Sequence, residues 1–180
     1  MTIQFAILGL LSWQSLSGYD LKKIFADSAV LYWSGNNNQI YKALLQLHEQ
    51  GLVTQEIQNQ EYLPAKKTYT ITEKGRTALK AWVLSTPELP EVHNAFLIQL
   101  SWADLLTEEE LDVMLRRYEE EVQVQLLMQK EKARRMEPSS ARTPREAYLW
   151  EMTLNNVLSV YENELAWVRR VREGLLHLAS

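Results

Sequence analysis

The chain has 180 residues, no cysteine and a net charge of −4 at pH 7. These values exclude a disulfide framework and a thiolate metal site, and they do not suggest a protein that attracts polyanions over its whole surface. No apolar stretch reaches the roughly 18 residues of a membrane span, and the apolar start lacks the basic n-region of a signal peptide. We therefore expect a cytoplasmic globular protein without a membrane partner.

Charge is divided unevenly along the chain. Residues 1–84 carry eight Lys and Arg against six Asp and Glu, whereas residues 85–180 carry eleven against seventeen. This asymmetry predicts two parts with different roles. The stretch "STPELPE", residues 85–91, contains two prolines and marks a boundary. We place domains at 1–86 and 87–180.

The first domain begins with three predicted helices. Residues 3–11 form a short apolar helix, and "SGYD", from Ser17 to Asp20, is a capping box that opens a second helix. A third helix follows "NNN" at residues 36–38, with Asn36 as its cap. It ends before Gly51, which has the position of a C′ glycine.

A hairpin and a fourth helix complete this domain. Val53, Gln55 and Ile57 alternate with polar residues, and so do the residues around 69–71, which predicts two strands. Residues 58–67 are polar and contain a proline, so we expect a long loop there. Thr72 then caps the fourth helix.

The third helix has two distinct faces. At about 100° per residue, Ile40, Leu44 and Leu47 share a buried side, and Asn38 and Lys42 lie opposite. Asn and Gln side chains can pair with adenine, Lys can reach guanine, and a Tyr hydroxyl can bind phosphate. The candidate DNA-contacting residues of this helix are Asn37, Asn38, Gln39, Tyr41 and Lys42. The alternative interpretation is a solvated face behind a helix cap.

The order of elements adds to this pattern. Three helices followed by a two-stranded hairpin is the order of a winged helix-turn-helix domain. In the hairpin loop, Lys66 and Lys67 are suited to contact with the DNA backbone. The alternative is a pair of ordinary surface lysines.

The second domain is predicted to be all helix. Residues 93–106 form a short apolar helix, and "TEEE" at 107–110 is a capping box that opens a long helix to about residue 136. After a turn at 138–144, a last helix spans about 145–178. Its apolar residues are spaced four and three apart, close to a heptad seam interrupted by Arg172. The seam residues are Leu154, Leu158, Tyr161, Leu165, Val168 and Leu175. Such a stripe needs a partner, so we expect self-association; the alternative is an intramolecular bundle.

Five segments together resemble one family, the PadR-like transcriptional regulators, which are winged-helix repressors of bacteria. They are "FAILGLLS", "LSGYDLKKIF", "WSGNNNQIYKALLQLHEQGLV", "PAKKTYTITEKGRTAL" and "ELPEVHNAFLIQLSWADLL". The resemblance covers nearly the whole chain. Its two long C-terminal helices look like the subgroup with the larger C-terminal domain.

The resemblance implies a mainly α fold with a small β-hairpin, in which an N-terminal winged helix-turn-helix domain precedes a C-terminal helical dimerisation domain. It implies a homodimer on a near-palindromic double-stranded DNA operator. It carries DNA contact to the third-helix residues and lysines named above, and to Ser17, Gly18 and Tyr19 at the start of the second helix. Before the wing proline, family members often have Gly-Arg where this chain has Tyr62 and Leu63.

The resemblance also implies a sensor. Family members often respond to small aromatic molecules, and the second domain is rich in aromatic residues that would suit such an effector. The candidate lining is Trp102, Tyr118 and Trp150. The alternative is that these residues belong to the core and interface.

The sequence offers no catalytic pattern. The histidines at 48, 93 and 177 lack metal-ligand spacing, and there is no phosphate-binding loop or nucleophile motif. We expect no catalytic residue, no cofactor and no metal. The competing hypothesis for function is a winged-helix protein–protein interaction module with a helical oligomerisation tail.

Overall fold

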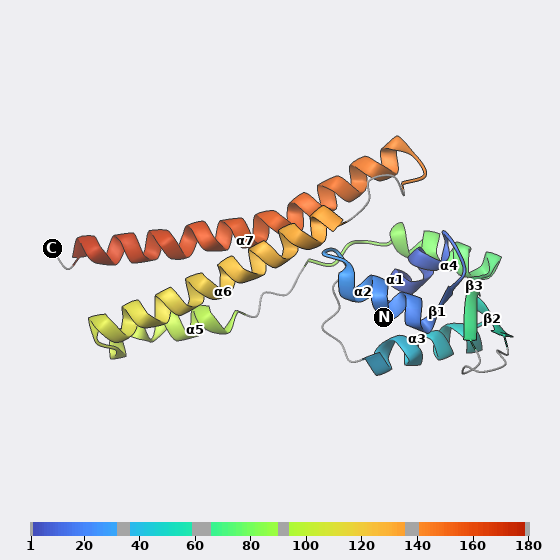
Figure 1. The fold of residues 1–180 in the computed structure, drawn as a ribbon, viewed down its shortest axis with the longest axis horizontal. Helices are drawn as coiled ribbons and strands as arrows, with labels where there is room; N and C mark the ends of the chain where they lie inside the picture. The colour runs from blue at the N-terminus through green and yellow to red at the C-terminus, as the bar shows by residue number, and fades with distance from the viewer. Residues whose placement is uncertain (1, 32–36, 59–65, 90–93, 136–140, 179–180) are drawn as a thin grey trace. The chain divides into compact units, whose positions relative to one another are not determined.

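The structure is a computed structural model that describes residues 2–31, 37–58, 66–89, 94–135 and 141–178. It divides into two compact units, Met1–Glu88 (unit 1) and Leu89–Ser180 (unit 2), which are described separately. The fold is mainly helical with a small antiparallel sheet (Figure 1). This confirms the fold class predicted from the sequence.

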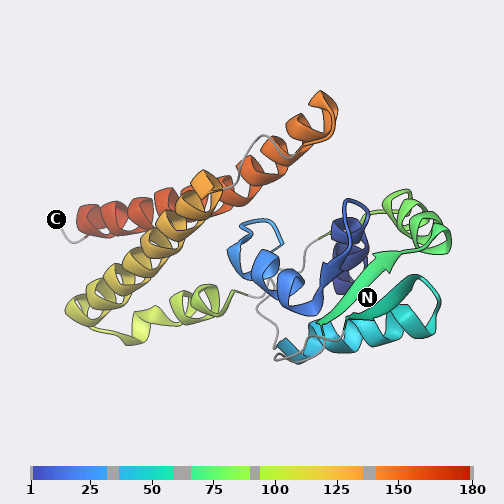
Figure 2. The ribbon, with the colours of Figure 1, turned by 45° about the vertical axis from the view of Figure 1, so that its right-hand side comes forward.

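The described residues of unit 1 form four helices and three strands. They are α1 (Thr2–Leu11), β1 (Leu16–Ser17), α2 (Gly18–Asp27), α3 (Asn37–Glu49), β2 (Val53–Gln58), β3 (Lys66–Ile71) and α4 (Glu73–Val83). The strands form an antiparallel sheet in the order β1-β3-β2, and β2 and β3 are its hairpin (Figure 2). Strand β1 was not predicted; its two residues pair with β3, with Leu16 opposite Tyr69.

Two predicted helix-end signals of unit 1 are confirmed, whereas the helix predicted at 93–106 is the shorter Ala95–Ser101 followed by a 3-10 turn at Ala103–Leu105. Ser17 and Asp20 form the complete capping box of α2. Gly51 has a φ of 67°, and the N–H groups of Gly51 and Leu52 donate to the carbonyls of His48 and Leu47, both at 2.9 Å. This pair of bonds is a Schellman motif. The predicted cap Asn36 lies outside the described residues.

The hairpin strands extend further than predicted. Gln58 pairs with Lys66 and Ile57 with Lys67, so three residues expected in the loop belong to the ladder instead. The cross-strand register overrides the local polarity from which the loop was predicted. Residues 59–65, including Tyr62 and Leu63, lie outside the described part.

The core of unit 1 lies between α1, α2, α3 and the sheet. On α3, Ile40 is 6% exposed and Leu44 and Leu47 are fully buried. They pack in one cluster with Ile7, Leu8, Leu11, Leu21, Phe25, Val53 and Ile71. The buried face predicted for α3 is therefore confirmed, and it fixes which side of the helix faces solvent.

Unit 2 is helical. Its elements are α5 (Ala95–Ser101), the short 3-10 helix η1 (Ala103–Leu105), α6 (Glu108–Arg135) and α7 (Pro144–Leu178). Helices α6 and α7 run antiparallel, since Arg172 pairs with Asp112 and Lys130 with Glu162. In the described part of the chain, no helix is both long and apolar enough to cross a bilayer.

Both long helices begin at side-chain caps. The Thr107–Glu110 box is formed as predicted, with the Glu110 carboxylate accepting from the Thr107 N–H at 2.9 Å. Helix α7 starts one residue earlier than predicted. Pro144 occupies its first position, where a missing N–H costs nothing, and the Thr143 hydroxyl accepts from the Glu146 N–H at 3.1 Å.

The predicted seam of α7 packs inside a single chain. Leu165 is 8% exposed and Val168 is fully buried. They share a cluster with Leu115, Val122 and Leu126 of α6, against which Leu158, Tyr161 and Leu175 also pack. Leu154 is half-buried. The stripe faces α6 of its own chain, and a role of these residues in self-association stays a prediction.

Candidate functional site

The outer face of α3 presents the polar residues that the sequence singled out. Asn38, Gln39 and Lys42 are exposed, and the Tyr41 side chain is 52% exposed. Helix α3 begins at Asn37, whose side chain lies outside the description, and its first turn carries no acidic residue. The positive end of the helix dipole therefore lies at these polar residues, where it favours negative charge.

Packing of the opposite side of α3 against the core keeps its polar face toward solvent. Ala43 is only 3% exposed beside the apolar residues described above, so one side of α3 is committed to the core. On its flank, the Gln4 amide of α1 donates to the Gln46 carbonyl at 2.8 Å. The first turns of α3 are therefore a fixed polar surface.

Tyr41 lies against the beginning of α2. A Cβ atom added to Gly18 would lie 2.6 Å from Cε1 of Tyr41, so the ring packs on the glycine. Burial raises the pKa of the Tyr69 hydroxyl, and the nearby Tyr41 raises it further. Tyr41 therefore links α3 to the first turn of α2 and to β3.

The three residues predicted to contact DNA at the start of α2 differ in exposure and in hydrogen bonding. The Ser17 side chain is buried, and its hydroxyl donates to the Asp20 carboxylate at 2.7 Å, so it serves the cap and not a ligand. Gly18 is also buried, whereas Tyr19 is 70% exposed. The capping box uses the N–H groups of Ser17 and Asp20, which leaves those of Gly18 and Tyr19 without a partner inside the helix.

The wing strand β3 carries the predicted lysine contacts. Lys67, Tyr69 and Ile71 share one face of β3, because alternate residues of a strand point to the same side. Lys67 is exposed, and the Lys66 side chain lies outside the description. The structure therefore places Lys67 on the sheet face that carries Tyr69, the neighbour of Tyr41.

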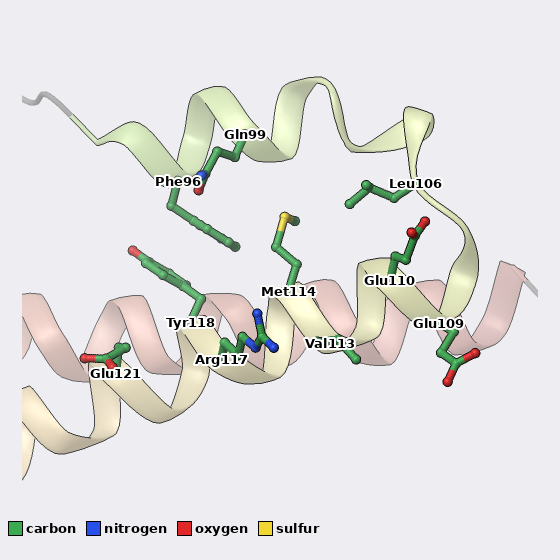
Figure 3. Close-up of a pocket in the computed structure, with 10 residues that line it drawn as sticks. All are labelled: Phe96, Gln99, Leu106, Glu109, Glu110, Val113, Met114, Arg117, Tyr118 and Glu121. Atoms are coloured by element: carbon green, nitrogen blue, oxygen red, sulfur yellow. The ribbon is translucent and has the colours of Figure 1, made fainter.

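A second candidate site lies in unit 2, in a cleft between α5 and the first half of α6 with a volume of about 630 Å³ (Figure 3). Of the three aromatic residues predicted for a pocket, only Tyr118 lines it. Trp102 is 71% exposed, and Trp150 is on α7. Sequence reasoning missed Phe96 and Met114, because no sequence signal shows that α5 folds over α6.

The described residues contain no group of three or more His, Cys, Asp or Glu that could hold a metal ion. His48 has a structural contact, since its Nδ1 lies 3.3 Å from the Val53 carbonyl oxygen. His93 lies outside the described residues.

Two family models match the chain. The model "Transcriptional regulator PadR-like family" matches residues 7–81, and the model "Virulence activator alpha C-term" matches residues 92–175. The first falls within unit 1 and the second within unit 2.

Two relatives illustrate the similarity. The negative transcriptional regulator PadR of Bacillus subtilis is 33% identical over 109 residues, which are 60% of this chain and 60% of that protein, so the match spans less than two thirds of the relative. Its structure with operator DNA has a TM-score of 0.81 at 25% identity, covering 95% of this chain and 97% of that one. Its structure with p-coumaric acid has a TM-score of 0.77 at 25% identity, covering 95% and 96%. The Vibrio cholerae virulence activator AphA has a TM-score of 0.70 at 26% identity, covering 97% and 98%.

Proposed function

Because the chain carries a domain of the PadR-like family of transcriptional regulators, followed by a virulence-activator α C-terminal domain, we propose that it represses transcription by binding operator DNA as a homodimer. The exposed first turns of α3, with Asn38, Gln39, Tyr41 and Lys42, carry this proposal. The fold resembles that of a relative whose structure was solved with operator DNA.

In this proposal α3 enters the major groove. Asn38 and Gln39 offer paired donor and acceptor groups that match an adenine edge, and Lys42 can reach a guanine or a phosphate. The Tyr41 hydroxyl and the N–H groups at the start of α2 bind the flanking backbone. Lys67 of the wing, together with Lys66, contacts phosphates beside the groove.

Two recognition helices require two chains. Half-sites of an operator lie about 34 Å apart, so one α3 cannot read both. On α6, Val124, Leu127 and Met128 are each at least 49% exposed, and their i, i+3, i+4 spacing places them on one face. On α7, Tyr148, Leu149, Met152 and Val160 are also exposed. These apolar faces support self-association through unit 2.

The relatives support the finer roles. The repressor role follows the B. subtilis relative, which is named a negative regulator. The p-coumaric acid complex of that relative supports a small aromatic effector that releases DNA. We further propose that the protein acts in the cytoplasm, where bacterial DNA lies, and that it regulates and does not catalyse.

Fluorescence anisotropy with two duplexes tests this function. One duplex carries the DNA flanking the protein's own gene, and the other has the same composition in scrambled order. We expect at least tenfold tighter binding to the first, and log affinity that falls linearly with log salt concentration. Equal affinity for both duplexes at moderate salt would reject the proposal and favour a protein–protein interaction module.

A further inference from the structure

The cleft of unit 2 has the size of a small-molecule site. Its volume of about 630 Å³ lies within the range of about 300–1,000 Å³ that ligand pockets occupy. Figure 3 shows Phe96 and Gln99 extending from α5 toward α6, and Met114 and Tyr118 extending from α6 toward α5. All of its lining residues belong to unit 2, so the cleft does not depend on how the two units are arranged.

Its inner wall is aromatic and firmly held. The Phe96 ring stacks on Tyr118 with centroids 3.6 Å apart, and Trp167 meets the Phe96 ring edge-on with centroids 6.2 Å apart. The Tyr118 hydroxyl donates to the Glu164 carboxylate. Asn94 donates to both groups, at 3.3 Å each. These contacts hold the aromatic rings of the wall in place.

The rim is mainly acidic. Glu109, Glu110 and Glu121 line the cleft against one cation, Arg117. Hydrogen bonds from Thr107 hold the pKa of Glu110 below its usual range, so its carboxylate is charged near neutral pH. A negative rim beside an aromatic wall attracts an organic cation through ion pairing and disfavours a carboxylate.

From this combination we infer that the cleft between α5 and α6 binds a small aromatic cation. Its ring lies against Met114 and Phe96, and its protonated amine lies at Glu121, one helical turn beyond Tyr118. This inference rests on the proposed function as an effector-responsive regulator. It differs from the relative's p-coumaric acid, whose carboxylate has the opposite charge.

The cleft is also placed to influence α5. Asn94 caps this helix by accepting from the Phe96 N–H at 3.0 Å, and its amide nitrogen ties the helix to Tyr118 and Glu164. In the sequence, α5 follows directly after the residues that join the two units. A ligand that separates α5 from α6 must strain these contacts, which gives the cleft a route to regulation.

Isothermal titration calorimetry of the full chain tests the inference with two probes. Tyramine and p-coumaric acid carry the same phenol ring and opposite charges at neutral pH. We expect tyramine to bind at least tenfold more tightly than p-coumaric acid.

Glu121→Gln should weaken tyramine binding by about fivefold, as an exposed charge pair allows. Glu120→Gln makes the same charge change on the neighbouring exposed residue, which does not line the cleft, and should leave binding unchanged.

Two further variants test the interior of the cleft and the positive charge of Arg117 on its rim. Met114→Trp should fill the cleft and abolish tyramine binding, provided circular dichroism and light scattering show native helix content and an unchanged oligomer. Arg117→Gln, on the exposed rim, should tighten tyramine binding. Equal affinity for the two probes, equal effects at positions 120 and 121, or dissociation of the oligomer by Met114→Trp would each overturn the inference. DNA binding measured without ligand tests the proposed function separately.

Discussion

Gly18 and Tyr41 meet so closely that a side chain at position 18 would displace the Tyr41 ring. The ring of Tyr41 occupies the space in which a Cβ at position 18 would lie, 2.6 Å from Cε1. Because Tyr41 is about half exposed, its ring can swing toward solvent when displaced. A side chain at position 18 should therefore disturb the proposed DNA-binding surface more than the core.

The first prediction concerns Gly18→Ala. We expect the free energy of unfolding to fall by about 1 kcal/mol or less, because the displaced ring relieves the overpacking. Operator affinity should fall by about tenfold, because the Tyr41 hydroxyl leaves its position. Gly9→Ala is the control, since a Cβ there meets nothing within 4 Å. Urea unfolding and anisotropy measure both effects, and unchanged affinity in Gly18→Ala would contradict the role of Tyr41.

Local signals in the sequence were sufficient to predict the starts of α2 and α6 and the end of α3. Ser17 with Asp20, and Thr107 with Glu110, form capping boxes whose partners are three residues apart. Gly51 ends α3 with a positive φ that its residue type allows. The polar face of α3 was also predictable, because 3.6-residue periodicity shows which side is buried.

Contacts between distant residues were not predictable in this way. Strand β1 exists because Leu16 pairs with Tyr69, a partner far along the chain. The apolar stripe of α7 was visible, but periodicity cannot show that α6 of the same chain covers it. The cleft of unit 2 likewise depends on Phe96 stacking on Tyr118, which no local pattern reports.

A second prediction separates base contact from phosphate contact on α3. Asn38→Ala should cost about 1–3 kcal/mol of operator binding and relax specificity at one position of the site. Lys42→Ala, if the lysine binds phosphate, should weaken binding to all duplexes alike and reduce the salt slope by about 1. Lys80→Ala removes the same charge from α4 and should change neither quantity. Identical losses at positions 42 and 80 would indicate a general charge effect.

A third prediction uses two glycines with opposite roles. Gly51 has a φ of 67°, so Gly51→Ala should destabilise unit 1 by about 1 kcal/mol. Gly174 is exposed within α7, with nothing within 4 Å of its added Cβ. Gly174→Ala should therefore stabilise α7, by up to about 1 kcal/mol. Hydrogen exchange resolved by segment measures both effects, and a gain in stability at position 51 would refute the Schellman assignment.

The last prediction concerns the ion-pair network between α6 and α7. Glu119 accepts from Arg169 at 2.8 Å and from Arg172 at 2.6 Å, and Arg172 also reaches Asp112 at 3.2 Å. Hydrogen bonds from Arg169 and then Arg172 lower the pKa of Glu119 below its ordinary 4.5. A carboxylate with a lowered folded-state pKa stabilises the fold above its ordinary pKa, and that stabilisation is lost as pH falls through the lowered value.

Glu119→Gln should therefore reduce protection of α6 and α7 against hydrogen exchange at pH 7, by about 1.5 kcal/mol for the lost charged hydrogen bonds. The difference from the unmodified protein should shrink as pH falls below 4.5 and through the lowered pKa of Glu119, because protonation of Glu119 then removes the charge that the variant lacks. Glu120→Gln serves as the matched control, since Glu120 is exposed on the same helix. A difference that stayed constant from pH 7 to the acid range would show that Glu119 acts through packing and not through its charge.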